Sequence, residues 1–160
     1  TFNESVATAV EREGVKRWLD ARGDDASGRA YGEFALRRSQ FLDLLLKYRN
    51  LLQENYSSGV PDEVKRARKQ QLFAELKQEY ARLKESWGGF AVYDLYFAQD
   101  LNNAHLAAVG AYNDRVPAFD ALLAQSNGNM PAFYSEVKRI AALPKAERTA
   151  ALTRLQPPSR

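Results

Sequence analysis

The residues with the clearest potential for chemistry open the chain, in the run Thr1-Phe2-Asn3-Glu4-Ser5-Val6-Ala7. Glu4 is expected in the first turn of a helix, where a carboxylate suits the helix dipole and can also serve as a metal ligand. A zinc site of the His₂Glu type needs two imidazoles besides that carboxylate, and this sequence holds one histidine and no cysteine. The chain as it stands cannot complete such a site by itself.

The composition is that of a chain able to bury a core of its own. Of its 160 residues, 45% are hydrophobic, and the lack of cysteine excludes disulfides and thiolate chemistry. The formal net charge of +3 is a mild excess, so we expect no nucleic-acid partner. We expect one helical domain over residues 1–160. Because the chain begins with Thr1 rather than Met, we also expect that further residues precede it.

Apolar residues recur at helical spacing along nearly the whole chain, which predicts an all-α fold. We expect a helical bundle with a long antiparallel helical hairpin and several shorter C-terminal helices. The predicted helices cover residues 3–22, 29–56, 61–86, a short stretch within 90–97, 102–112, 116–125, 131–142 and 145–155. Asn3 is expected to cap the first helix, and Gly23 to end it.

The two longest predicted helices carry apolar stripes that would pack against each other, with the helices antiparallel, over about 40 Å. The first stripe is Phe34, Phe41, Leu45, Tyr48 and Leu52, and the second is Val64, Leu72, Leu76, Tyr80, Leu83 and Trp87. The aromatic cluster that follows consists of Phe90, Tyr93, Tyr96 and Phe97. We interpret this cluster as core rather than as a surface that stacks on a substrate, because grouped aromatic side chains are usually buried.

A polar group shares one face of the predicted helix 102–112. Asn102, His105 and Tyr112 lie at offsets of three and seven, with Asn103 beside them, so they could line a polar cleft. The structural interpretation makes Asn102 a helix cap, His105 a hydrogen-bonded packing residue and Tyr112 a core ring. On the residues alone we favour that structural interpretation, because a single histidine more often has such a role.

Several segments resemble, in the same order, a family of bacterial zinc aminopeptidases. The likeness begins with Phe2-Asn3-Glu4-Ser5-Val6-Ala7-Thr8, Val10-Glu11-Arg12-Glu13-Gly14 and Trp18-Leu19, which resemble the segment after the zinc-binding helix of that family. It continues through Trp87-Gly88-Gly89, Leu101-Asn102-Asn103-Ala104, Leu106-Ala107, Tyr112 and Val116-Pro117-Ala118-Phe119. The resemblance therefore covers most of the chain.

The resemblance implies a gluzincin-type metallopeptidase that cleaves a peptide substrate. In such enzymes a His-Glu-x-x-His helix supplies two zinc ligands and the general base, and an Asn-Glu-x-x-Ala helix supplies the third ligand, here Glu4. Asn3 would then fix the helix start, and Thr8 and Glu11 would support the ligand from one and two turns further on. Tyr112 is the expected hydroxyl that stabilises the oxyanion, with His105 as its competitor.

The His-Glu-x-x-His motif is absent from this sequence, so the resemblance places both histidine ligands and the general base before Thr1. The chain would be the C-terminal portion of the enzyme, inactive and without zinc when alone, and its partner would be the missing N-terminal portion. The family also resembles lipoproteins, which implies a bacterial periplasmic location and a lipid-anchored N-terminus. The alternative is a non-enzymatic helical module that binds a partner protein through its hairpin or its aromatic segment.

Overall fold

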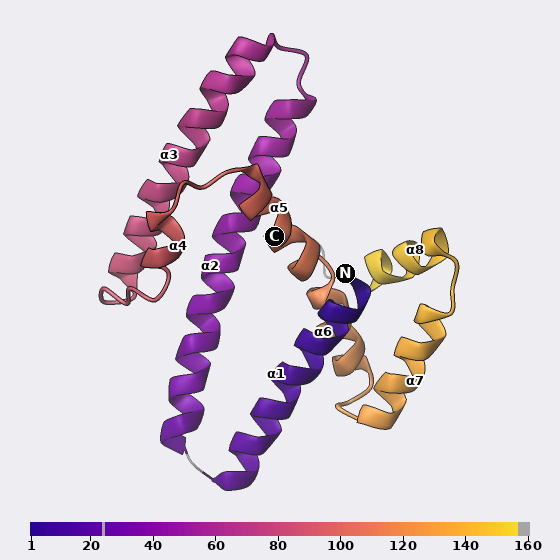
Figure 1. The fold of residues 1–160 in the computed structure, drawn as a ribbon. Coiled ribbons are helices and arrows are strands. Elements are labelled where there is room, and N and C mark those ends of the chain that lie inside the picture. The colour runs from indigo at the N-terminus through magenta and orange to yellow at the C-terminus, as the bar shows by residue number, and fades with distance from the viewer. Residues whose placement is uncertain (24, 157–160) are drawn as a thin grey trace. The chain divides into compact units, whose positions relative to one another are not determined.

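The fold is all-α, as the sequence predicts. The computed structural model describes residues 1–23 and 25–156, with the backbone alone at residues 111 and 112. Within these residues it contains eight α-helices and no strand (Figure 1). The chain divides into two compact units, residues 1–25 with 111–160 and residues 26–110, which we call the four-helix unit and the hairpin unit. The expectation of a single domain stays a prediction.

The four-helix unit is built around its second helix. It comprises α1 (Phe2–Arg22), α6 (Val116–Gln125), α7 (Met130–Ala141) and α8 (Lys145–Leu155), and α6 contacts each of the other three. The residues that form its core are Ala9, Ala118, Phe119, Leu122, Leu123, Phe133, Ile140 and Leu152. Phe119 is fully buried and meets the ring of Phe2 edge-on, with the ring centroids 5.1 Å apart. This contact packs the first turn of α1 against α6.

Local sequence signals fix two of the helix ends in this unit. Gly23 ends α1 in the left-handed conformation, with φ of 63°, as predicted. Asn129 caps α7, because its side chain accepts a hydrogen bond from the amide of Ala132 at 3.0 Å. The capping role predicted for Asn3 is wrong: α1 begins at Phe2 with Thr1 as N-cap, and the amide of Ser5 already donates to the carbonyl of Thr1. Asn3 therefore has a helical backbone, which a cap residue does not have.

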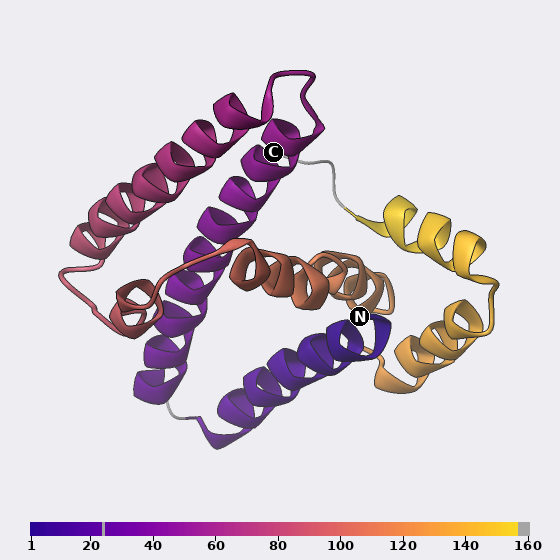
Figure 2. The same ribbon diagram turned by 45° about the horizontal axis from the view of Figure 1, so that its top comes forward.

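The hairpin unit contains the predicted antiparallel pair of long helices. They are α2 (Asp25–Ser57) and α3 (Asp62–Ser86), which are followed by the short α4 (Asp94–Ala98) and by α5 (Asn103–Asn113). Trp87 donates to Gln40 near one end of the pair, and Asn55 donates to the carbonyl of Lys65 near the other. Later residues of α2 thus lie beside earlier residues of α3, so the two helices run antiparallel, as both views show (Figure 1 and Figure 2). The predicted hairpin is confirmed.

The core of the hairpin unit follows most of the predicted stripes. Its buried residues are Phe41, Leu44, Leu45, Tyr48, Leu52, Leu72, Leu76, Tyr80, Leu101 and Leu106. Phe34 and Val64 were expected in the stripes but are 41% and 51% exposed. Gln40 already pairs with the residue that follows α3, so Phe34 lies where α2 extends past its partner helix. Val64 lies in the first turn of α3, next to the turn that joins the two long helices.

The aromatic cluster packs against this core, as predicted. Tyr93 stacks on Phe41 with ring centroids 3.8 Å apart, and Phe97 stacks on Tyr80 at 4.0 Å. These contacts hold the segment with α4 against both long helices. None of the helices in the described part of the chain is long and apolar enough to span a bilayer.

Candidate functional site

Glu4 has a partly exposed carboxylate side chain, of which the Oε2 atom is buried. It lies in the first turn of α1, and its side chain is 44% exposed. Its Oε2 atom lies 3.2 Å from the α-amino nitrogen of Thr1. A hydrogen bond from its own backbone amide is the largest cause that lowers the pKa of this carboxyl, and it stabilises the charged form. This charged form is the one that a carboxylate ligand needs in order to bind a cation.

The other residues predicted around Glu4 do not complete a metal site. Thr8 is half-buried and Glu11 is exposed, and the side chain of neither residue makes a hydrogen bond to the carboxylate of Glu4. Nowhere among the described residues do three or more His, Cys, Asp or Glu side chains gather closely enough to hold a metal ion. The described residues therefore offer no complete set of protein ligands for zinc, and a zinc site that used Glu4 would need ligands from outside them.

Asn102 and His105 form a reciprocal cap at the start of α5. The Oδ1 atom of Asn102 accepts from the amide of Ala104 at 3.0 Å, and the amide of Asn102 donates to Nδ1 of His105 at 3.2 Å. The imidazole also meets the ring of Tyr96 edge-on, with centroids 6.2 Å apart. The structural interpretation of these two residues is thus confirmed. Because Nδ1 accepts, the proton of the neutral imidazole lies on Nε2, which is left as a donor.

The remaining predicted residues are Asn103 and Tyr112. Asn103 donates from Nδ2 to the hydroxyl of Tyr56 at 2.9 Å, while its Oδ1 atom is buried without a hydrogen-bond partner. Tyr112 lies within α5, and its side chain falls outside the described part of the structure. Asn102, Asn103 and His105 belong to the hairpin unit and Glu4 to the four-helix unit. The structure therefore brings together the polar residues at the start of α5, which belong to a different unit from Glu4.

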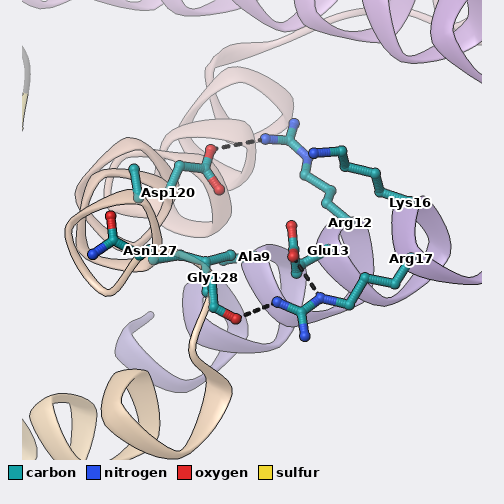
Figure 3. A pocket seen from close by; sticks show the side chains of 10 residues that line it. Ala9, Arg12, Glu13, Lys16, Arg17, Asp120, Asn127 and Gly128 are labelled. Atoms are coloured by element: carbon teal, nitrogen blue, oxygen red, sulfur yellow. Dashed lines mark hydrogen bonds and ion pairs between the residues drawn. The ribbon is translucent and has the colours of Figure 1, made fainter. Parts of the chain in front are cut away.

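The sequence interpretation missed a hollow of about 600 Å³ beside α1 (Figure 3). The hollow is lined by Ala9, Arg12, Glu13, Lys16, Arg17, Asp120, Leu123, Ala124, Asn127 and Gly128. Arg12 lies 3.2 Å from Asp120 on α6, and Arg17 pairs with Glu13 and donates to the carbonyl of Gly128. The sequence signal was the pair of basic residues Arg12 and Lys16, which lie one helical turn apart.

The hollow is lined by more basic than acidic side chains. Partial burial raises the pKa of Asp120, and the nearby Arg12 only partly opposes this shift. Lys16 extends along the side of the hollow that Arg12 occupies (Figure 3). Its side chain makes no hydrogen bond or ion pair with the described residues. The hollow therefore has more positive charge than its own carboxylates neutralise.

Comparison with protein families identifies the chain. The family described as "Putative aminopeptidase" matches residues 1–152. The chain belongs to this family. The match includes Glu4, the cap at the start of α5 and every residue that lines the hollow, so all the candidate sites of this aminopeptidase-family chain lie within it. No curated protein and no solved structure matches the chain.

Proposed function

We propose that this aminopeptidase-family chain is the C-terminal portion of a zinc-dependent aminopeptidase, in which Glu4 is the third zinc ligand. Membership of the family over residues 1–152 is the observation that carries this proposal. The ionised, half-exposed carboxylate of Glu4 in the first turn of α1 supports it. The two histidine ligands and the general base come from a His-Glu-x-x-His segment outside this chain, because the chain has a single histidine.

Within that enzyme the chain's own residues supply one metal ligand and hold that ligand in position. Zinc, when bound, polarises the scissile carbonyl of the peptide substrate and lowers the pKa of a water molecule. Glu4 supplies a charged oxygen ligand, and Thr8 and Glu11 support its orientation from the same face of α1. The chain alone binds no zinc and is inactive. The resemblance of the family to lipoproteins leads us to propose a bacterial periplasmic location with a lipid anchor.

Two residues of α5 are proposed to stabilise the oxyanion that forms during cleavage. Tyr112 offers a phenolic hydroxyl, and His105 offers the Nε2 proton that its hydrogen bond at Nδ1 leaves free. The cap formed with Asn102 supports the role of His105, because it fixes both the tautomer and the direction of the ring. Asn102 and Asn103 line the cleft in this proposal.

The test is to replace Glu4 in the intact protein. Glu4→Ala should lose bound zinc and the hydrolysis of aminoacyl anilides together, because one of three protein ligands is gone. Zinc is measured by elemental analysis, and activity is measured by release of the anilide. Glu147→Gln, an exposed carboxylate in the first turn of α8, is the matched control and should change neither quantity. A Glu4→Ala protein that keeps both zinc and activity would refute the proposal.

A non-enzymatic interaction module remains the second candidate function. Exposed apolar side chains on the hairpin unit favour it, because Leu95 is 86% exposed and Leu36 is 59% exposed. On this alternative the intact protein binds no zinc, and Glu4→Ala leaves its thermal midpoint almost unchanged. The same elemental analysis therefore separates the two functions.

A further inference from the structure

The hollow beside α1 has the properties of a small ligand site. We propose that it binds a small organic carboxylate with an aliphatic body, held by Arg12 and Lys16. Its volume of about 600 Å³ lies in the range that small-molecule sites occupy. This proposal goes beyond the peptidase function and does not depend on zinc, since all of its residues belong to the four-helix unit.

Arg12 and Lys16 supply the donors for the anion. Arg12 makes one contact inside the unit, from Nη1 to Asp120 at 3.2 Å, and its other guanidinium N–H groups have no partner among the described residues. Lys16 is exposed and unpaired within the same set of residues. Both side chains extend along one side of the hollow (Figure 3). A carboxylate placed there would accept hydrogen bonds from two cations at once.

Arg17 also lines the hollow, but it has a different role from Arg12 and Lys16. Its guanidinium is held by Glu13 at 2.6 Å and by the carbonyl of Gly128. Gly128 has a φ of 70°, and a Cβ atom there would come within 3.1 Å of Arg17. The glycine therefore permits the close approach that joins α1 to the loop after α6. Arg17 shapes the hollow, and Arg12 and Lys16 remain available to a ligand.

Asp120 is a weak competitor for Arg12. Its carboxylate makes a single contact at 3.2 Å, and partial burial disfavours its charged form. An incoming carboxylate can bind the guanidinium with two parallel hydrogen bonds, which is the geometry that arginine favours. The ligand can thus gain more from Arg12 than Asp120 does.

The rest of the lining selects the kind of anion. Ala9 and Leu123 are buried and Ala124 lies beside them, so the hollow also offers aliphatic surface to a ligand's body. Arg12, Lys16 and Arg17 are balanced in part by Glu13 and Asp120, which leaves one net positive charge. That balance matches a singly charged carboxylate better than a doubly charged phosphate.

The experiment is an NMR titration of the ¹⁵N-labelled chain with N-acetyl-L-leucine. We expect saturable shifts of the amides of Ala9, Lys16 and Gly128. Arg12→Ala and Lys16→Ala should each weaken binding about tenfold, because each removes a charged hydrogen bond to the ligand. Asp120→Asn should instead tighten binding by a few fold, since it removes the competing charge and keeps the shape. The amide spectrum and the helical circular dichroism of each variant establish that it is folded.

Matched probes and variants make the result decisive. N-acetyl-L-leucinamide has the same aliphatic body without the charge and should not bind. Arg139→Ala, which removes an exposed arginine paired with Glu136 on α7, should leave the affinity unchanged. The proposal is overturned if the shifts do not saturate or if the neutral amide binds equally well. It is also overturned if Arg12→Ala and Lys16→Ala, both folded, bind normally, or if inorganic phosphate binds at these residues and N-acetyl-L-leucine does not.

Discussion

The two units of the chain differ in how some of their charged side chains are paired. In the hairpin unit a tyrosine and a lysine hold the same carboxylate, and this happens twice. Tyr48 and Lys47 both donate to Glu79, and Tyr80 and Lys84 both donate to Asp94. In the four-helix unit Lys16 lies unpaired among the described residues and Glu4 presents half of its carboxylate side chain to solvent.

This difference separates stability from chemistry. A polar group whose hydrogen bonds are satisfied inside the fold contributes to stability and has little left to offer a ligand. A charged group left open in a hollow or at a helix start can bind a ligand. The hairpin unit therefore has mainly the character of a scaffold, and the polar cap at the start of α5 is its candidate exception. Glu4 and the basic hollow are the candidate ligand-binding groups of the four-helix unit.

The chain contains a fluorescent reporter for each unit. Trp18 lies in the four-helix unit and Trp87 in the hairpin unit, and they are the two tryptophans of the sequence. Trp87→Phe leaves Trp18 as the reporter, and Trp18→Phe leaves Trp87. Urea unfolding of such single-tryptophan backgrounds follows the two units separately.

The largest effect is expected from emptying the core of the four-helix unit. Phe119→Ala removes a fully buried ring and its edge contact with Phe2, so it should lower the free energy of unfolding by about 3–5 kcal/mol. Urea unfolding followed at Trp18 measures this loss. Tyr134→Ala, at a side chain 42% exposed, is the control and should cost far less. Equal losses at both positions would contradict the assigned core.

In the hairpin unit the next largest effect is expected where a tyrosine and a lysine both donate to one carboxylate. We call each such group a clamp and name it by its carboxylate, as in the Glu79 clamp. Tyr48→Phe removes the hydrogen bond to Glu79 and should cost about 1–2 kcal/mol, measured by urea unfolding at Trp87. Tyr96→Phe is the matched control, because the hydroxyl of Tyr96 is buried without a hydrogen-bond partner. That change should be neutral or stabilising. If Tyr96→Phe costs as much as Tyr48→Phe, satisfied hydrogen bonds do not explain the stability of this unit.

A smaller effect is expected at the loop that borders the hollow. Gly128→Ala forces a side chain onto a residue with φ of 70° and against Arg17, so it should cost about 1 kcal/mol. Gly14→Ala is the opposite control. It lies inside α1 with open space around its Cβ position, so it should stabilise the unit by about 0.5–1 kcal/mol. Thermal unfolding followed at Trp18 measures both, and a stabilising Gly128→Ala would contradict the described loop.

The smallest effect is the pH dependence of the Glu79 clamp. Hydrogen bonds from Lys47 and Tyr48 hold the pKa of Glu79 below its ordinary value of 4.5. A lowered folded-state pKa means that this stabilisation is fully present above pH 4.5 and is lost as the pH falls through the folded-state value. Glu79→Gln should therefore lower the thermal midpoint at pH 7 by about one degree and have little effect at pH 2. An equal effect at both values would exclude a role for the charge.

Alkaline unfolding gives the same clamp a second test from the other partner. Burial, with the hydrogen bond to Glu79 next, raises the pKa of Tyr48 from 10.0 to about 12. The stabilisation is thus complete below pH 10 and declines as the pH rises toward 12. Tyr48→Phe should remove this part of the alkaline decline in the thermal midpoint, and an unchanged decline would contradict the raised pKa.

The helices and their ends were largely predictable because they depend on neighbours in sequence. Apolar spacing gave α6 and α8 with their observed bounds, and Gly23 ends α1 as expected. The start of α2 was predicted four residues late, at Arg29 rather than Asp25, because Gly28 and Gly32 weaken the helical pattern there. The capping role of Asn3 was wrong because one further residue, Phe2, is already helical.

Sequence alone determined that this chain is all-α, that its two longest helices pair, and that its single histidine cannot complete a zinc site of the His₂Glu type by itself. The tertiary structure decided which charged residues meet. Arg12 contacts Asp120 across 108 positions, and Arg17 reaches Gly128 across 111. No local pattern encodes such a pairing, because it depends on how the face of α1 packs against α6. Periodicity and capping are local, whereas a ligand-binding hollow exists only once distant helices have packed together.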